Sequence, residues 1–535
     1  MLAGAELAAK DCVIVRAAVT LLLPYMRKSN ATEGGTASRQ GSARAPIKRA
    51  PRGNDKASGL GTDAASRIAE ALRSKLDKLP PGTRLPSVRE LTERHEASPV
   101  TVQRALAQLS REGRVVTRPG DGTFVAAIKS QTEPIDVSFQ ALALGANSVG
   151  LDIGMSPFAT ANKQLIPLGT GYMDLASQPL ALLRAASLRA ARREDVWSRV
   201  PAEGLDPLRA WFARDIGGDI TARQVLIVPG GQAALSAVLR ALVPAGASLL
   251  FESPSYFGAL AIARAAGIRP VPVPSDLEGV RPDALEATIA RTGARALYLQ
   301  PAYSNPTGAV MSSARRSAVI DIARRANIFL IEDDYARDLT IEGVVPPPLV
   351  RDCPSHVVYI RSLTKTAAPG LRIAAIAALG PVLERLRAAR AVDDWFVSGM
   401  LQEIALELVG SPGWPRHIAQ LRATLRERRD AAVDAIRSEL PTSSLAHVPR
   451  GGFNMWIALP ESLDDLDIAQ KAEQAGVHIN AGRSWFPAEP LGPFLRLSYA
   501  AAEPRDIREG VRKLARVIES SLGRGRPARF DRAER

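Results

Sequence analysis

One lysine stands where its neighbours suggest chemistry. Lys365 lies in "IRSLTKTAAPGLRI" (360–373), among small hydroxyl residues after an apolar run, and Arg372 follows seven positions later. Burying an ammonium group costs free energy, so a lysine at the end of a buried strand has to be paired, neutralised or used in a reaction. Since most lysines are simply exposed, the rest of the chain has to decide whether Lys365 is a nucleophile.

Further polar residues follow other short apolar runs, which we expect to be strands. The segments are "PGGQAAL", "ESPSYFGAL", "PAYSNPTG" and "IEDDYARDL". Ligands of open parallel sheets bind at the carboxyl ends of the strands, so we expect these residues to meet in one site. With the lysine segment they supply Gly231, Gln232, Tyr256, Asn305, Asp333, Tyr335, Ser362, Thr364, Lys365 and Arg372.

This set of side chains suits one cofactor. Pyridoxal 5′-phosphate needs a lysine for a Schiff base, a carboxylate that keeps its ring nitrogen protonated, and cationic and hydrogen-bonding groups for its phosphate. The glycines before the expected helix at 233–242 offer free backbone N–H groups to an anion. The sequence therefore predicts a pyridoxal phosphate site and, from the five histidines and two cysteines, no metal site.

In this order and spacing, residues 165–520 resemble the fold type I, class I aminotransferases. The resemblance implies three catalytic residues: Lys365 as the internal aldimine lysine, Asp333 at the pyridine nitrogen, and Tyr256 stacked on the ring. The other implied cofactor contacts are Asn305 and Tyr335 at the phenolic oxygen and Gly231, Gln232, Ser362, Thr364 and Arg372 around the phosphate. Arg496 in "FLRLSYA" matches the arginine that clamps a substrate carboxylate, with Asn305 beside it.

The elements that would position these residues alternate along the chain. Short apolar runs such as "VLIVPG", "SLLFESP", "ALYLQPA", "IFLIEDD", "HVVYIRSL" and "LRIAAIAAL" are separated by amphipathic stretches, including 233–242 and 313–326. This alternation predicts an α/β domain with a mostly parallel sheet and flanking helices. The resemblance adds a small C-terminal subdomain, and we assign the whole domain to residues 166–523.

A second pattern precedes this domain. Helical spacing of apolar residues starts at Ala64, and Ser87 and Ser98 are candidate N-caps of two further helices. Pro99 takes the favoured first helical position, and "PGDG" separates two short strands. The apolar residues of the first expected helix are Ile68, Leu72, Leu76 and Leu79. This order is typical of a winged helix-turn-helix.

Residues 61–128 resemble the winged helix-turn-helix of the GntR family of bacterial transcription regulators, in the stretch "LPSVRELTERHEASPVTVQRALAQLSREGRVVTRPGDGTFVA". The resemblance implies binding to a double-stranded DNA operator. The implied DNA contacts are Arg89 in the second helix, Ser98, Thr101 and Gln103 at the start of the recognition helix, and Arg118 and Gly120 in the wing.

The two parts together resemble the MocR-type regulators of the GntR family. That resemblance implies a homodimer with crossed-over DNA-binding heads, and a transcription regulator that senses an amino acid or amine by aldimine chemistry. Two alternatives stay open. The chain reads "SNPTG", as working aminotransferases do, so it is either a regulator or an active aminotransferase with a fused head. It is also compatible with a sensor of pyridoxal phosphate supply.

Composition agrees with a DNA-binding protein of a reducing compartment. The 535 residues carry a net charge of +14, and two cysteines cannot form a disulfide framework. The apolar stretch near the start is interrupted by Arg16 and is too short to span a bilayer, so we expect a cytoplasmic protein without a membrane contact. We expect a disordered basic extension at 1–60, a linker at 129–165 and a basic tail at 524–535.

Overall fold

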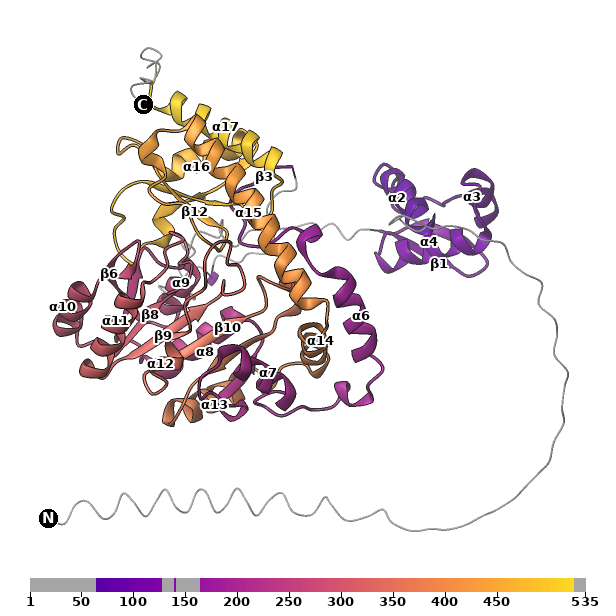
Figure 1. Ribbon diagram of the computed structural model, residues 1–535. Helices are drawn as coiled ribbons and strands as arrows, with labels where there is room; N and C mark the ends of the chain where they lie inside the picture. Colours follow the sequence, from indigo (N-terminus) through magenta and orange to yellow (C-terminus); the bar gives the residue numbers. More distant parts are fainter. Residues whose placement is uncertain (1–63, 128–138, 141–163, 524–535) are drawn as a thin grey trace, which may run out of the picture. The chain divides into compact units, whose positions relative to one another are not determined.

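The computed structural model describes residues 64–127, 139–140 and 164–523. The chain divides into two compact units, Met1–Asp136 and Val137–Arg535 (Figure 1). The extension expected at 1–60, most of the linker expected at 129–165 and the basic tail expected at 524–535 lie outside the described residues.

The described part of the amino-terminal unit, residues 64–127, consists of three helices and a hairpin. The order is α2 (Ala64–Leu76), α3 (Val88–Arg94), α4 (Pro99–Arg111), β1 (Val115–Arg118) and β2 (Gly122–Val125), and the two strands pair antiparallel. The helical faces meet in one core that includes Ile68, Leu72, Leu91, Val102, Leu106 and Leu109. The winged helix-turn-helix order predicted from the sequence is confirmed.

Local capping explains where these helices begin. Ser87 caps α3 in a capping box with Glu90, and the Ser98 side chain accepts a hydrogen bond from the Thr101 N–H at 3.2 Å. One expectation was wrong: α2 ends at Leu76, so Leu79 lies beyond it and is exposed. The reason is the following "PPG", which stops the helix before the apolar spacing has run its course.

The second unit is built on a sheet with strand order β4-β11-β10-β9-β8-β5-β6-β7. The neighbours β10, β9, β8, β5 and β6 run parallel, whereas β11 is antiparallel to both β10 and β4. The mostly parallel sheet predicted from the sequence is confirmed. The strands are β4 (Val225–Val228), β5 (Ser248–Ser253), β6 (Arg269–Asp276), β7 (Gly279–Val280), β8 (Ala296–Leu299), β9 (Phe329–Asp334), β10 (Val357–Ser362) and β11 (Ala374–Ala377).

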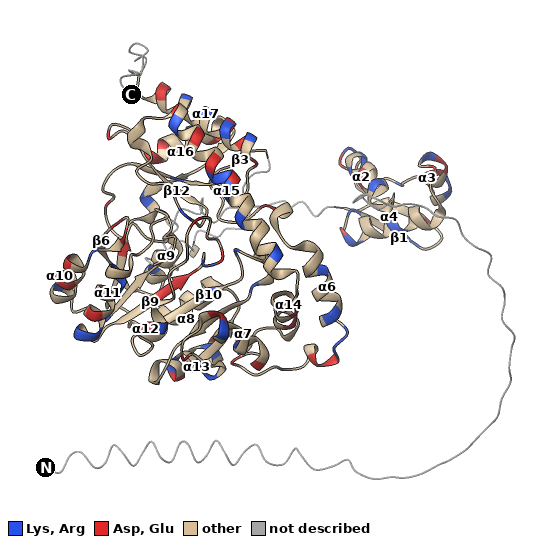
Figure 2. Cartoon of the chain, in the orientation of Figure 1, with Lys and Arg blue, Asp and Glu red and all other residues tan. Residues whose placement is uncertain are grey.

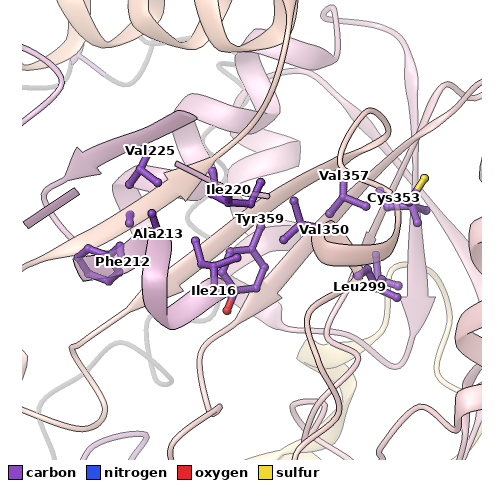
Figure 3. Packing of buried hydrophobic residues seen from close by; sticks show 14 of the residues in the cluster. Phe212, Ala213, Ile216, Ile220, Val225, Leu299, Val350, Cys353, Val357 and Tyr359 are labelled. Atoms are coloured by element: carbon purple, nitrogen blue, oxygen red, sulfur yellow. The ribbon is translucent and has the colours of Figure 1, made fainter. Parts of the chain in front are cut away.

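Both faces of this sheet are covered by helices. Alternate residues of one strand enter different cores: Val357 and Tyr359 of β10 belong to one, and Val358 and Ile360 to the other. Figure 3 shows the first core, where Phe212 of α7 is among the residues packed near the sheet. The first core draws on α7 (Asp206–Ile216), α10 (Pro282–Thr292), α11 (Ser313–Ala326), α12 (Leu349–Asp352) and α14 (Gly399–Val409), and the second on α8 (Gly231–Leu242), α9 (Phe257–Ala265) and α13 (Pro381–Asp393).

A smaller subdomain follows, with a core of its own. Its antiparallel sheet has the order β12-β15-β14, and β13 pairs in parallel with β3, which comes from the start of the unit. The elements are β3 (Ile166–Pro167), β12 (Asn454–Ala458), β13 (Val477–His478), β14 (Asn480–Ala481), β15 (Phe494–Ser498), α15 (Trp414–Glu439), α16 (Asp465–Gln474) and α17 (Pro504–Ser521). The pairing of β3 brings the segment after residue 167 beside residues far along the chain.

Sequence reasoning missed β6, whose segment "RPVPVPSD" contains three prolines. Proline has no N–H to donate to a neighbouring strand. Because the three prolines stand at alternate positions, their backbone nitrogens all point to the same edge of β6. β6 pairs with β5 from Arg269 to Pro274 and with β7 only at Ser275 and Asp276. In the described part of the chain, the edge of β6 away from β5 therefore has no strand beside the prolines.

No helix among the described residues is long and apolar enough to cross a membrane.

Candidate cofactor and amino-compound site

The ten cofactor-binding residues expected from the sequence and Arg496 line one cavity of about 490 Å³ in the second unit. Most lie just after the carboxyl ends of β4, β5, β8, β9 and β10, which the parallel pairing brings to one edge of the sheet. The lining residues are Gly169, Thr170, Gly171, Tyr172, Gly231, Gln232, Leu235, Tyr256, Phe257, Gln300, Asn305, Asp333, Tyr335, Ser362, Thr364, Lys365, Arg372, Phe453, His478 and Arg496.

One end of the cavity has the chemistry of an anion site. Gly231 and Gln232 form the first turn of α8, where backbone N–H groups have no partner within the helix. The Arg372 guanidinium donates to the Pro229 carbonyl oxygen at 2.9 Å. Gly230 has φ +94°, and a Cβ there would lie 2.6 Å from Cζ of Arg372, so this turn requires glycine.

The hydroxyls of Ser362 and Thr364 complete this end. The Ser362 hydroxyl donates to Oγ1 of Thr364 at 2.9 Å and accepts from the Thr364 N–H at 3.2 Å. Ser362 is the last residue of β10, and Thr364 follows two residues later. With the helix start and the guanidinium, they form a donor set that fits a phosphate group.

Asp333 provides a buried carboxylate at the end of β9, where acidic residues gather (Figure 2). Its Oδ2 accepts hydrogen bonds from the Tyr298 hydroxyl at 2.7 Å and from Nε2 of Gln300 at 2.9 Å. Burial raises the pKa of Asp333, although both donors lower it. Within the described residues no donor reaches Oδ1 of Asp333. This oxygen is therefore able to accept a hydrogen bond from a protonated ring nitrogen of a ligand.

Lys365 is held opposite a backbone carbonyl that the sequence had not singled out. Its Nζ donates to the Gly171 carbonyl oxygen at 2.8 Å and lies 3.8 Å from the Tyr172 ring centroid. Burial, together with the positive charges of Arg496 and Arg372, lowers the pKa of Lys365 to about 7, although Asp333 opposes the shift. Near neutral pH a large fraction of this lysine is therefore an uncharged amine, which is the nucleophilic form.

Asn305 and the two expected tyrosines are fixed by neighbours. Oδ1 of Asn305 accepts from Nε1 of Trp485 at 3.0 Å, which leaves the Asn305 amide nitrogen as the group able to donate to a ligand. The Tyr256 hydroxyl donates to Oε1 of Gln232 at 3.2 Å. Tyr335 donates to the Tyr303 carbonyl oxygen at 2.7 Å and, like Tyr256, has a pKa raised by burial.

Arg496 lies on β15 of the small subdomain, and its side chain is buried and lines the cavity. Nη1 donates to Asn454 at 2.9 Å, and Nη2 donates to Asn480 at 2.9 Å and to the Gly169 carbonyl oxygen. Its Nε is buried without a hydrogen-bond partner, and burial lowers the pKa of Arg496 to about 10. A buried cation with an unsatisfied donor suits a carboxylate ligand.

The charges of the cavity agree with this donor chemistry. Among the described residues that line it, Lys365, Arg372 and Arg496 are basic and Asp333 is the one acid. An anionic ligand with a phosphate and a second acidic group is therefore favoured. No group of three or more His, Cys, Asp or Glu residues in the described parts of the chain is arranged to hold a metal ion.

Several lining residues escaped the sequence reasoning. Residues 169–172, in "PLGTGY", reach the cavity because β3 pairs with β13, a contact that no local pattern announces. A Cβ at Gly169 would lie 2.7 Å from the His478 ring, so the glycine permits this close approach. Phe453, His478 and Gln300 were also missed, and only the run of glycines at 169 and 171 could have drawn attention to this segment.

The residues expected to contact DNA lie in the amino-terminal unit. Arg89 and Gln103 are exposed, and Gly120 has φ +79° at the hairpin turn. Arg118 is exposed and stacks on Phe124, with Cζ 4.7 Å from the ring centroid. Ser98 and Thr101 engage each other at the N-terminus of α4, with their hydroxyl oxygens 2.9 Å apart.

Comparisons with known proteins agree with both units. The family "Aminotransferase class I and II" matches residues 163–514, and "Bacterial regulatory proteins, gntR family" matches residues 64–125. The chain is 30% identical over 456 residues to the uncharacterized HTH-type transcriptional regulator YdfD of Bacillus subtilis, covering 83% of this chain and 94% of that protein. It is 27% identical to the HTH-type transcriptional regulator TauR of Rhodobacter capsulatus, over 82% of this chain and 92% of TauR.

The second unit also matches solved structures. LysN, the alpha-aminoadipate aminotransferase of Thermus thermophilus, was solved with N-(5′-phosphopyridoxyl)-L-leucine. It aligns with a TM-score of 0.64 and 30% identity over 67% of this chain and 93% of LysN. The expected fold type I aminotransferase architecture is confirmed, and the family implies pyridoxal phosphate as cofactor. The chain therefore belongs to the aminotransferase class I and II family and carries a GntR-family head, which is the architecture of the MocR-type regulators.

Proposed function

We propose that this protein is a transcription regulator that binds a DNA operator through residues 61–128 and senses an amino acid or amine through pyridoxal phosphate bound in residues 166–523. The assembled cavity carries the proposal: a phosphate cradle, a buried carboxylate and a lysine with a lowered pKa line the same 490 Å³. The match to transcriptional regulators over 83% and 82% of this chain supports the regulatory role over a purely metabolic one.

The residues of the cavity fit the cofactor. Gly231, Gln232, Ser362, Thr364 and Arg372 would hold its phosphate. Asp333 Oδ1 would hold the ring nitrogen, with Asn305 and Tyr335 near the phenolic oxygen and Tyr256 against the ring. When bound, pyridoxal phosphate supplies an aldehyde carbon that amines attack and a ring that withdraws electrons from it.

Lys365 and Arg496 would divide the handling of the amino compound. Nζ of Lys365, which is partly uncharged near pH 7, would hold pyridoxal phosphate at its aldehyde carbon. The same amine would accept or return a proton beside the bound compound. Arg496, buried with Nε unpaired, can bind the carboxylate of an amino acid and so orient it, with Asn305 nearby.

In the amino-terminal unit, the proposed contacts follow the geometry of helix-turn-helix proteins. Arg89, Arg118 and Gly120 would meet the phosphate backbone or the minor groove, since they are exposed on α3 and at the hairpin turn. Gln103, exposed near the start of α4, would read base edges in the major groove. Ser98 caps α4 by accepting from the Thr101 N–H, and we propose that the hydroxyls of Ser98 and Thr101 contact DNA from this end of the recognition helix.

We also propose that the protein acts in the cytoplasm as a homodimer with crossed-over heads. On the second unit, Trp197 and Trp395 are 76% and 59% exposed, and Arg199 stacks on Trp395 at 5.1 Å. Large exposed apolar side chains are typical of a contact surface. Sedimentation equilibrium on the full chain tests this point, and a monomer at micromolar concentration would contradict it.

The main test is an absorbance titration of the loaded protein. We expect a visible band from the bound cofactor, a change of that band on adding amino acids, and a change in operator affinity at the same concentrations. Adding 2-oxoglutarate afterwards separates the alternatives: sustained turnover would identify an active aminotransferase, and a cofactor response without any amine response would identify a sensor of cofactor supply. A chain that stays colourless after incubation with pyridoxal phosphate would refute the proposal.

A further inference from the structure

Gln300 occupies a central position that the cofactor motifs leave unexplained. It follows β8 directly, is 2% exposed, and lines the cavity between the end of β9 and the loop that carries Asn305. A fully buried glutamine loses rotamer freedom and needs partners for both halves of its amide. Its contacts therefore indicate what it does.

The amide of Gln300 joins two of the proposed cofactor ligands. Nε2 donates to Oδ2 of Asp333 at 2.9 Å, and Oε1 accepts from the Asn305 N–H at 2.9 Å. The reverse orientation of the amide would set oxygen against a carboxylate and NH2 against an N–H donor. The chemistry of the two partners thus fixes which way the amide points.

The backbone of Gln300 is held as firmly as its side chain. Its N–H donates to Oε1 of Glu252 at 2.9 Å, and the same oxygen accepts from the Ser304 hydroxyl at 3.0 Å. Glu252 is itself buried on β5, the neighbouring strand. The amide is therefore anchored on a rigid part of the sheet, where it can impose a geometry on its partners.

We propose that Gln300 is a positioning residue that fixes Asp333 and Asn305 together, so that the groups at the ring nitrogen and at the phenolic oxygen of the cofactor keep one relative placement. This inference rests on the proposed cofactor site. With Oδ2 of Asp333 occupied by Gln300 and Tyr298, Oδ1 is presented to the ring nitrogen. With its backbone tied to Gln300 and Oδ1 to Trp485, Asn305 presents its amide nitrogen.

The consequence is electronic as well as geometric. A donor on Asp333 favours its ionised form, and an ionised Asp333 keeps the ring nitrogen protonated. A protonated ring withdraws electrons from the group attached to Lys365 and lowers the pH at which that group loses its proton. Removing the Gln300 amide should therefore raise this pH and weaken cofactor binding.

Two variants separate the contacts of Gln300. Gln300→Leu removes both side-chain hydrogen bonds at similar volume. Gln300→Glu keeps an acceptor for the Asn305 N–H and replaces the amide donor by a second carboxyl group that competes with Asp333 for a proton. We expect Gln300→Leu to weaken pyridoxal phosphate binding roughly tenfold or more. We expect both variants to move the pH midpoint of the bound cofactor's visible absorbance upward by about one unit.

Gln402 supplies a matched control. It is fully buried on α14, its Oε1 accepts from the Leu205 N–H at 2.8 Å, its Nε2 donates to the Val397 carbonyl oxygen at 2.8 Å, and it does not line the cavity. Gln402→Leu should lower the melting temperature and leave the absorbance midpoint and the cofactor affinity unchanged.

The measurements are cofactor affinity, the absorbance midpoint across pH, and the melting temperature of the full-length protein. If Gln300→Leu behaves like Gln402→Leu, with stability lost and the midpoint unmoved, Gln300 is merely structural and the inference is wrong. If Gln300→Leu does not fold, an unmoved midpoint in Gln300→Glu overturns it equally. A wild-type protein that binds no pyridoxal phosphate would instead refute the proposed function.

Discussion

The proposed DNA surface and the proposed cofactor site use side chains in opposite environments. In the amino-terminal unit the side chain of Arg89 is 90% exposed and pairs with Glu93 only at 3.3 Å, an interaction worth little in water. In the second unit Arg496 is 4% exposed and its guanidinium donates to three acceptors. An exposed cation can be replaced at small cost, whereas a buried one is tied to the fold around it.

The two regions also differ in how they are assembled. The proposed DNA contacts lie between residues 89 and 120 on elements adjacent in the chain. The cavity gathers residues from Gly169 to Arg496, from both the large sheet and the small subdomain. Single substitutions on the DNA surface should therefore have small effects on DNA binding. Single substitutions in the cavity should have large effects on cofactor binding.

The sharpest test of this contrast is Lys365→Ala. It removes the one amine that lines the cavity in the described part of the chain, so we expect complete loss of the visible band of the bound cofactor with the fold intact. Absorbance and circular dichroism measure both. Lys513→Ala, at a partly exposed lysine paired with Glu509, is the control and should keep the band. A persisting band in Lys365→Ala would remove the basis of the cofactor assignment.

The next largest effect is expected at Arg496. Arg496→Lys keeps a charge and loses the fork that grips a carboxylate, so the response to amino acids should weaken by about 2 to 5 kcal/mol. The response to amines without a carboxylate should stay near wild type, because they do not use the guanidinium. Titration of the cofactor band with an amino acid and with the matching amine distinguishes the two. Equal weakening for both compounds would show that Arg496 supports the fold only.

Loading of the cofactor-free protein should depend on pH. Burial lowers the pKa of Lys365 to about 7. The fraction of Lys365 in the reactive, uncharged form therefore falls about tenfold for each pH unit below 7, and above pH 8 nearly all of the lysine is uncharged. The loading rate should rise with pH and level off just above 7. Stopped-flow absorbance at several pH values measures it. A rate that still rises steeply at pH 9 would contradict the lowered pKa.

Substitutions at two glycines distinguish the cost of a positive φ from the cost of a steric clash with a neighbouring side chain. Gly230 and Gly246 have φ of +94° and +83°, so alanine at either position should cost about 1 kcal/mol of stability. Only at Gly230 would the added Cβ meet Arg372, while Gly246 has nothing within 4 Å. Gly230→Ala alone should weaken cofactor binding, by several-fold. Equal affinities in the two variants would remove Gly230 from the phosphate cradle.

The smallest effects are expected on the DNA surface. Gln103→Ala should narrow the gap between operator and random DNA by about 1 to 3 kcal/mol with the salt dependence unchanged. Arg89→Ala should weaken binding to operator and random DNA alike, and it should reduce the slope of log affinity against log salt concentration by about one. Binding titrations at several salt concentrations on both DNAs measure the difference. The division of roles is wrong if Arg89→Ala removes operator preference and Gln103→Ala leaves it intact.

Much of the fold could be predicted because its signals are local. The caps at Ser87 and Ser98, the bounds of α11 and the six apolar strands all follow from side chains within a few residues of each element. The strand β6 was missed because its prolines argue against a strand until the neighbour on one side is known. The end of α2 was misplaced because Leu79 continues the apolar spacing up to the "PPG" at 80–82, whereas the helix ends at Leu76.

The sequence by itself determined the chemistry of this protein: the types and order of its lysine, aspartate, asparagine and arginines, and the local elements that carry them. Only the tertiary structure decided which atoms these residues turn toward a ligand. Gln300, Trp485 and the Gly171 carbonyl set those directions through contacts across 33, 180 and 194 residues. Local periodicity reports burial within one element, but contacts between distant segments arise only when the sheet and the small subdomain pack together.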